Sequence, residues 1–185
     1  MGEQPPLPTR RTRRTDALRP APPAVIKVLD MASVRITALD PMDPMALQAM
    51  SSFLNEMVER VDANALTSDP ADENEGYVAA GIFLVAMDER DNVVGCGALE
   101  EVEEGIAQIR RMWVNPVLRG QGIGRRLLSA LEGAAAVSGY ELIRLEVYDE
   151  LSEAILLYET SGYVRVEPDE AAPPDLRFYE RRTFA

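Results

Sequence analysis

The apolar positions of the chain predict a series of strands and helices that begins near residue 33. Val34 to Leu39 reads as a first strand, and Asp43-Pro44 then opens a helix whose apolar residues recur about every 3.6 positions. Two β-rich runs, Ile82 to Met87 and Val93 to Val102, flank a short polar turn and predict a hairpin. We therefore expect the domain to begin with a strand, a helix and an antiparallel hairpin.

The second half of the chain predicts another hairpin, followed by alternating helices and strands. A short turn at Glu104-Gly105 leads into a strand over Ile106 to Val114, which stops at Asn115-Pro116 because proline cannot donate to a strand ladder. The elements expected after it are a helix over Gly124 to Ser138, a strand over Leu142 to Tyr148, a helix over Leu151 to Thr160 and closing strands over Tyr163 to Val166 and Leu176 to Thr183. This order predicts a mixed α/β (α+β) fold.

The first 32 residues differ from the rest in composition. Six of the thirteen prolines and five arginines fall within residues 1–24, without helical or alternating apolar periodicity. We expect residues 1–32 to be a disordered tail and residues 33–185 to be one domain. The run from Arg10 to Arg14 either contacts nucleic acid or an acidic surface, or belongs to a solvated extension ahead of a start at Met31, and we favour the extension. Residues 62–80 predict a long acidic loop.

The composition excludes several classes of chemistry. The chain has no histidine, which rules out Ser-His-Asp triads, Cys-His dyads and histidine metal sites. Its one cysteine, Cys96, cannot form an intrachain disulfide, and we expect no metal. No apolar stretch approaches the about 20 residues of a membrane-spanning helix, so we expect a cytoplasmic protein without membrane contact.

The charge of the chain is strongly and unevenly negative. The net charge is −12, and residues 31–185 carry 13 basic and 28 acidic side chains, a balance of −15. Such a field repels nucleic acid and attracts cationic ligands. We therefore expect no nucleic-acid partner, and an amine fits as a substrate.

Three glycines at alternate positions precede the predicted helix at Gly124. Residues 117–125 run from the end of a strand into a helix N-terminus, where unpaired N–H groups and a partial positive charge attract anions. Arg119 and Arg125 add cationic donors. A P-loop is excluded because arginine follows Gly124, and the dinucleotide fingerprint is excluded because position 125 lacks its third glycine. A diphosphate is the ligand that we expect at this loop.

The segment Val114-Asn115-Pro116, followed by Arg119-Gly120-Gln121-Gly122-Ile123-Gly124 and a helix, resembles the acetyl-CoA-binding motif of the GNAT superfamily of N-acetyltransferases. Ala154 to Tyr163 is similar to the second cofactor segment of that family, and the resemblance covers roughly residues 33–183. It implies a GNAT fold, in which a central mixed, mostly antiparallel, splayed sheet of about six or seven strands is flanked by helices.

The resemblance also implies acetyl-CoA as the co-substrate. The diphosphate is then expected on the amides of the glycine loop, and the pantetheine arm is expected to pair with the main chain of Met112 and Val114. The cofactor-binding residues implied in this way are Met112, Trp113, Val114, Arg119, Gly120, Gln121, Gly122, Ile123, Gly124 and Arg125.

Tyr158 has two interpretations. By the resemblance it is the general acid that protonates the departing CoA thiolate, a role that a neutral tyrosine hydroxyl can fill. By periodicity alone it shares a helix face with Leu151, Ala154 and Ile155, and reads as a core aromatic. We expect Tyr158 to be catalytic.

The general base is where the chain departs from the family pattern. Gln108 occupies the strand position at which a number of relatives carry a catalytic glutamate, and glutamine cannot accept a proton. If the turn before this strand has two residues, the hairpin register pairs Glu103 with Ile106 and Glu101 with Gln108. Glu101 is therefore the expected replacement base, and Glu146 on the next strand is a further candidate.

Two functions remain open at this point. The favoured one is an enzyme that transfers an acetyl group directly from acetyl-CoA to a primary amine of a cationic acceptor, either a small molecule or a protein. The alternative, motivated by Gln108, is an acyl-CoA-binding sensor or partner module that keeps the fold without turnover. The sequence names neither the acceptor nor the oligomeric state, and a homodimer is compatible with it.

Overall fold

The computed structural model describes residues 34–61, 81–167 and 172–183. The expected disordered tail, residues 1–32, and the expected acidic loop, residues 62–80, lie outside the described residues. Within the described segments, no helix is long and apolar enough to span a membrane. The helices and strands follow the order predicted from the hydrophobic pattern.

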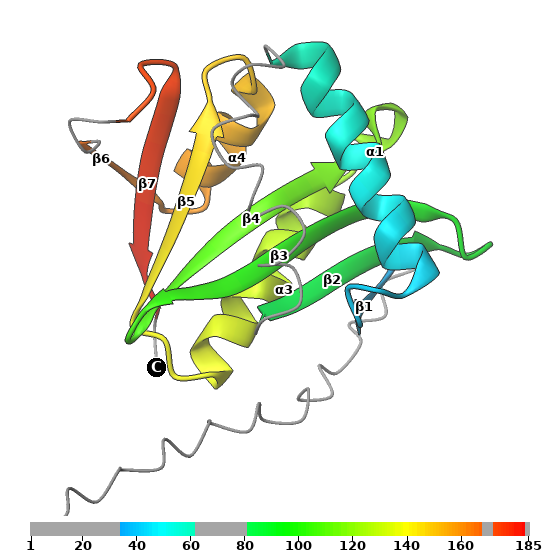
Figure 1. The fold of residues 1–185 in the computed structure, drawn as a ribbon, viewed down its shortest axis with the longest axis horizontal. Helices are drawn as coiled ribbons and strands as arrows, with labels where there is room; N and C mark the ends of the chain where they lie inside the picture. The colour runs from blue at the N-terminus through cyan, green and yellow to red at the C-terminus, as the bar shows by residue number, and fades with distance from the viewer. Residues whose placement is uncertain (1–33, 62–80, 168–171, 184–185) are drawn as a thin grey trace, which may run out of the picture.

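A seven-stranded sheet forms the centre of the domain, with the strand order β1-β2-β3-β4-β5-β7-β6 (Figure 1). The strands are β1 (Val34–Leu39), β2 (Gly81–Asp88), β3 (Val93–Glu103), β4 (Ile106–Val114), β5 (Leu142–Tyr148), β6 (Val164–Val166) and β7 (Leu176–Arg182). Neighbouring strands are antiparallel except β4 and β5, which are parallel and are joined by a helical crossover. The expected mixed, mostly antiparallel sheet is confirmed.

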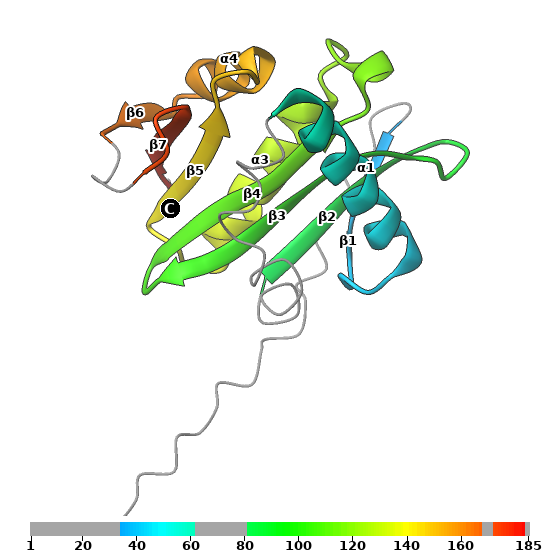
Figure 2. The same cartoon turned by 45° about the horizontal axis from the view of Figure 1, so that its top comes forward.

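Helices cover both faces of this sheet (Figures 1 and 2). α1 (Pro44–Arg60) lies over β2, β3 and β4 on one face, and it begins where the Asp43 carboxylate accepts a hydrogen bond from the Met45 N–H at 2.8 Å. The opposite face carries α3 (Ile123–Val137) and α4 (Ser152–Thr160). A short 3₁₀ helix, η3 (Pro116–Leu118), connects β4 to α3.

Each face of the sheet has its own apolar core, because successive strand residues point to opposite sides. The core on the α3 side includes Leu84, Leu99, Ile109, Leu127, Leu128, Leu131, Ile143, Leu145 and Tyr179, and the core on the α1 side includes Ala46, Ala49, Met50, Phe83, Val85, Cys96 and Trp113. The inner face of α3 is fully buried, as its leucine spacing predicts. The N-terminus of α3 is therefore held at a fixed place against the sheet.

The sheet splays open between β4 and β5. The two strands pair only along Ile106–Ile109 of β4 and Leu142–Leu145 of β5. Beyond that point β5 continues to pair with β7, whereas β4 bulges: Arg111 has a φ of 55°, and the β3–β4 register shifts between Cys96 and Ala98. The edge of β4 that faces β5 is unpaired over residues 110–114, and the expected splay is confirmed.

The register of the β3–β4 hairpin differs from the expectation at one position. Glu103 pairs with Ile106 as predicted, but Glu101 pairs with Ala107, and it is Glu100 that pairs with Gln108. The reason is a register shift between Glu101 and Glu103. Glu101 therefore shares a sheet face with Ala107, which is in the α3-side core, and the expectation that it lies beside Gln108 is wrong.

Candidate active site

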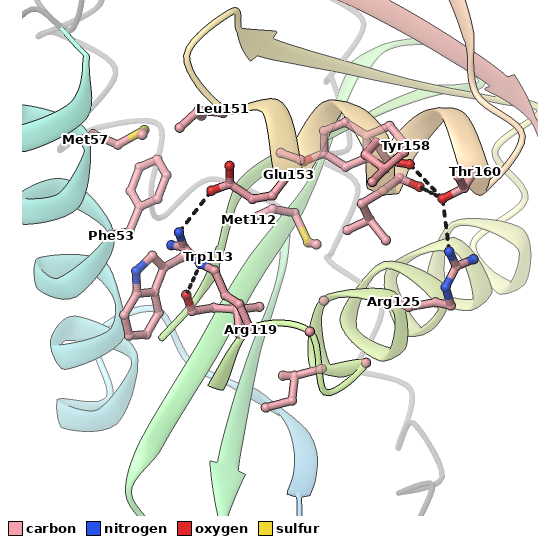
Figure 3. Close-up of a pocket in the computed structure, with 18 residues that line it drawn as sticks. Phe53, Met57, Met112, Trp113, Arg119, Arg125, Leu151, Glu153, Tyr158 and Thr160 are labelled. Carbon is pink, nitrogen blue, oxygen red and sulfur yellow. Dashed lines mark hydrogen bonds and ion pairs between the residues drawn. The ribbon is translucent and has the colours of Figure 1, made fainter. Parts of the chain in front are cut away.

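A pocket of about 490 Å³ opens where β4 leaves β5 (Figure 3). Its walls come from α1, the end of β4, the glycine loop and α4. The lining residues that the sequence predicted are Met112, Trp113, Val114, Arg119, Gly120, Gly122, Ile123, Gly124, Arg125 and Tyr158, and the structure adds Phe53, Met57, Leu151, Glu153, Ala154, Leu156, Leu157 and Thr160. Most of the expected cofactor-binding residues thus meet in one cavity. Gln121 and Glu101 are not among its lining residues.

The glycines of the loop serve two different purposes. Gly120 and Gly122 have φ angles of 76° and 84°, and a Cβ on either one would meet no atom within 4 Å. These two residues permit a left-handed turn that leaves open space beside the loop amides. Gly124 has a packing role instead, since its Cβ would lie 3.4 Å from Leu157 Cδ2 and 3.6 Å from Val114 Cγ2.

The start of α3 faces this open space without a side-chain cap. Gly122 is the N-cap residue and, as a glycine, provides no side-chain cap for the first turn of the helix. Unpaired N–H groups and the helix dipole together make a helix start an anion site. Arg125 in the first turn donates from Nη2 to the neutral Thr160 hydroxyl at 3.0 Å, and among the described residues it has no carboxylate in an ion pair.

Arg119 lies in a cluster of ion pairs that the sequence did not predict. Its Nη1 donates to Glu153 Oε1 at 2.9 Å (Figure 3). Its Nη2 is paired with Glu56, and its Nε donates to the Val114 carbonyl at 3.1 Å. Two carboxylates thus balance the charge of this guanidinium, and a contact between Arg119 and a diphosphate stays a prediction.

Glu56 and Glu153 were not predicted as site residues. Burial by itself raises the pKa of Glu56, but hydrogen bonds from Arg119 and Arg60 outweigh it and hold that pKa below its usual value. A hydrogen bond from Arg60 likewise lowers the pKa of Glu153. The only sequence signal for this cluster is the i, i+4 spacing of Glu56 and Arg60 in α1, which is typical of many surface helices.

Tyr158 is both a core residue and a pocket residue. Its side chain is 4% exposed, and its ring contacts those of Tyr163 at 6.0 Å and Tyr179 at 6.5 Å between centroids. Burial raises the pKa of the Tyr158 hydroxyl above its ordinary value, so the phenol is neutral at physiological pH. The two interpretations of this residue are compatible, since the packed ring presents a neutral proton donor at the pocket wall (Figure 3).

The candidates for a general base are found on the strands beside the splay. Gln108 is buried, and its Nε2 donates to Glu146 Oε1 at 2.9 Å, while its Oε1 accepts from Arg110 Nη2 at 3.2 Å. Glu146 follows directly after the last residue of β5 that pairs with β4. Glu101 lies instead near the hairpin end, exposed, with its carboxylate 3.5 Å from the Tyr140 hydroxyl. The structure brings Glu146 to the splay and does not bring Glu101 there.

Cys96 and metal chemistry offer no alternative centre in the part of the chain that the structure describes. Cys96 is fully buried, and burial raises the pKa of its thiol to about 12, which keeps it protonated and unreactive. Among residues 34–61, 81–167 and 172–183, no group of three or more His, Cys, Asp or Glu side chains is placed to hold a metal ion.

Comparisons with known proteins point to one family. The model of the acetyltransferase (GNAT) domain matches residues 79–165. An IAA acetyltransferase of Azospirillum brasilense is 38% identical over 94 residues, which cover 50% of this chain and 61% of that protein. The match therefore spans less than two thirds of the relative's length.

Two solved structures share the fold. A Klebsiella pneumoniae protein assigned to the acyl-CoA N-acyltransferases is 29% identical, with a TM-score of 0.65 over 82% of this chain and 98% of that one. The structure of yncA from Salmonella typhimurium, solved with its cofactor acetyl-CoA, is 20% identical, with a TM-score of 0.60 over 83% of this chain and 95% of that one. The family match runs from β2 to β6 and so includes the splay, the glycine loop and α4. Residues 79–165 of the chain thus match the acetyltransferase (GNAT) domain, and the fold is similar to that of solved GNAT acetyltransferases.

Proposed function

We propose that the protein is an N-acetyltransferase that moves an acetyl group directly from acetyl-CoA to a primary amine. One observation supports this proposal most strongly: the edge of β4 that does not pair with β5 and the N-terminus of α3 line the same pocket. Gly120 and Gly122, both in the left-handed conformation, leave open space beside the backbone amides of the loop. The similarity in fold to yncA, whose structure contains acetyl-CoA, supports the same ligand.

The pocket residues fit the two halves of acetyl-CoA separately. The loop amides from Gly120 to Gly124 and the guanidinium of Arg125 suit a diphosphate, because they combine N–H donors, a helix dipole and a positive charge. The main chain of Met112 and the N–H of Val114, whose carbonyl already accepts from Arg119, lie on the strand edge that does not pair with β5 and suit the amides of a pantetheine arm. Acetyl-CoA supplies an activated acyl group as a thioester.

Tyr158 is proposed as the general acid. Transfer to an amine requires the thiolate of CoA to depart, and a thiol with a pKa of about 8.5 leaves more easily when a donor protonates it. The neutral, raised-pKa hydroxyl of Tyr158 on the pocket wall is such a donor.

The proposed general base is Glu146, not Glu101. A protonated amine of pKa about 10.4 must lose a proton before it attacks, and a carboxylate assists that step, directly or through a water. Glu146 lies at the splay and is held by Gln108, the residue that replaces the glutamate of some relatives. Glu101 was expected to lie beside Gln108, but in the observed hairpin register it pairs with Ala107.

The acceptor is proposed to be a cationic amine of a small molecule or protein. The net charge of −12 favours association with such a molecule over an anionic one. A turnover assay tests the proposal: purified protein, acetyl-CoA and a broad amine panel are combined, and the release of the CoA thiol is followed. Acceptor-dependent release supports an enzyme, whereas tight acetyl-CoA binding without release from any amine contradicts it and indicates the sensor alternative.

A further inference from the structure

One partly buried carboxylate receives three donors beside the pocket. Glu56 of α1, whose side chain is 11% exposed, accepts from Trp113 Nε1 at 2.9 Å and from Arg60 Nη1 at 2.9 Å, and it pairs with Arg119. These donors come from β4, from α1 itself and from the glycine loop. Glu56 therefore joins three elements that build different walls of the same cavity.

The guanidinium of Arg119 links Glu56 to the glycine loop. Its Nε holds the carbonyl of Val114, the last residue of β4, and Arg119 itself immediately precedes Gly120. One side chain thus ties the two ends of the segment between β4 and the glycine loop. A third contact, from Nη1 to Glu153 at 2.9 Å, reaches α4 across the pocket (Figure 3).

We propose that Glu56 is a positioning residue for the acetyl-CoA site and that it acts through Arg119. Fixing Arg119 sets the distance between the loop amides, which suit a diphosphate, and the β4 edge, which suits a pantetheine arm. The inference rests on the proposed function, because it assumes that both features hold the same ligand. The carboxylate of Glu56 is already taken up by three donors, so we assign it no part in the chemistry itself.

The role predicts a particular pattern of kinetic change. Glu56→Gln keeps the shape of the side chain but removes the charge that pairs with Arg119 and Arg60. When Arg119 no longer fixes the glycine loop, acetyl-CoA binding weakens, while the side chains of Tyr158 and Glu146 keep their positions. The KM for acetyl-CoA and its Kd should therefore rise tenfold or more, and kcat at saturation should stay within about threefold of wild type. A merely destabilised protein would lose active molecules and hence kcat, with KM unchanged.

Trp113 gives a direct readout of this site. It is the only tryptophan of the chain, it lines the pocket, and its indole N–H is bonded to Glu56. Its fluorescence should change when acetyl-CoA is added, and the titration gives Kd. The emission of the ligand-free protein should also shift in Glu56→Gln, because the charged acceptor beside the indole is lost.

The decisive experiment is a double-mutant cycle with acetyl-CoA affinity as its readout. Glu56→Gln, Arg119→Gln and the double variant are titrated, with Glu180→Gln as a matched control that breaks a half-buried ion pair to Arg144 away from the pocket. If Glu56 acts through Arg119, each single variant binds at least tenfold more weakly and the double variant is no worse than the weaker single. The control should bind as the wild type does.

The outcomes separate this inference from the proposed function. Wild-type protein that fails to bind acetyl-CoA overturns the function itself. Wild-type binding together with a Glu56→Gln affinity within twofold of it, or with losses that multiply in the double variant, overturns the positioning role alone. If circular dichroism shows Glu56→Gln to be unfolded, Arg119→Lys serves in its place. A single ammonium nitrogen cannot take the three separate positions of Nε, Nη1 and Nη2 of Arg119, so unchanged affinity in Arg119→Lys also contradicts the proposal.

Discussion

Gln108 and Glu146 are joined by a hydrogen bond of 2.9 Å that links β4 to β5 at the point where the two strands separate. The donor is the amide of Gln108, and the acceptor is a carboxylate that is exposed toward solvent on the face that also carries α1. A buried amide that holds an accessible carboxylate restricts the orientations of that carboxylate without neutralising it. The glutamine is therefore a means of placing a base on the neighbouring strand.

This relationship predicts different outcomes for two glutamates. Glu146→Gln preserves an acceptor for Gln108 but cannot take a proton, so kcat should fall by about 10²- to 10⁴-fold while the Kd for acetyl-CoA stays near wild type. Glu101→Gln, at the exposed hairpin end, should keep kcat within about twofold. Steady-state kinetics at saturating acetyl-CoA measure both. The reverse result, a large loss in Glu101→Gln and none in Glu146→Gln, would restore the base suggested by the sequence.

A second prediction concerns Gly122, which has a φ of 84° and open space beside it. Gly122→Val places a branched side chain next to the α3 amides and forces a left-handed residue, at a cost of about 1–2 kcal/mol. Acetyl-CoA affinity should fall tenfold or more, as measured by calorimetry. Gly133→Ala in the same helix is the matched control: its Cβ meets nothing within 4 Å, so affinity should be unchanged and stability should rise by about 0.5–1 kcal/mol.

The ion pairs of Glu56 predict a contribution to the acid stability of the fold. Its folded-state pKa is lowered, so the stabilisation is present above the unfolded-state pKa and is lost as the pH falls through the folded-state value. Wild-type protein should lose stability on acidification below about pH 4.3, the ordinary glutamate pKa, more steeply than Glu56→Gln. Urea unfolding at a series of pH values measures the two slopes. Parallel curves would show that this carboxylate is not coupled to folding.

The features that the sequence predicted correctly are those encoded locally. The turn at Gly120 and Gly122 and the helix start that follows it depend on neighbouring residues, as do the alternation in the strands and the leucine face of α3. Together with the resemblance to the GNAT motifs, these features predicted that Met112, Val114 and Tyr158 belong to one site, and all three line the pocket.

The features that the sequence missed depend on packing between distant segments. The predicted register of the β3–β4 hairpin was wrong because of a single extra residue between Glu101 and Glu103. That residue moves the side chains before it to the opposite sheet face, and the rules for turns do not predict it. The ion pair between Arg119 and Glu56 was not predicted, because Glu56 lies 63 positions earlier in the chain, in α1. Only the packing of α1 across β4 brings that carboxylate to the loop, and a charged residue on a helix is otherwise typical of a solvated face.

The last prediction concerns Tyr158, whose ring and hydroxyl have separable roles. Tyr158→Phe keeps the aromatic contacts with Tyr163 and Tyr179, so the fold and the pocket wall should persist with only a small change in melting temperature. Loss of the proton donor should lower kcat by about 10²- to 10⁴-fold, while the Kd for acetyl-CoA, which depends on backbone amides at the loop, stays near wild type.

The leaving group provides the control for this acid role. An acyl donor whose thiol is more acidic than CoA departs with less need of protonation, so the ratio of wild-type to Tyr158→Phe rates should shrink with such a donor. Tyr163→Phe is the matched variant, because it removes a hydroxyl from the adjoining tyrosine, which does not line the pocket. Its kcat should remain within about threefold of wild type. Equal losses in the two variants, or a Tyr158→Phe ratio that is the same for both donors, would assign Tyr158 to packing alone.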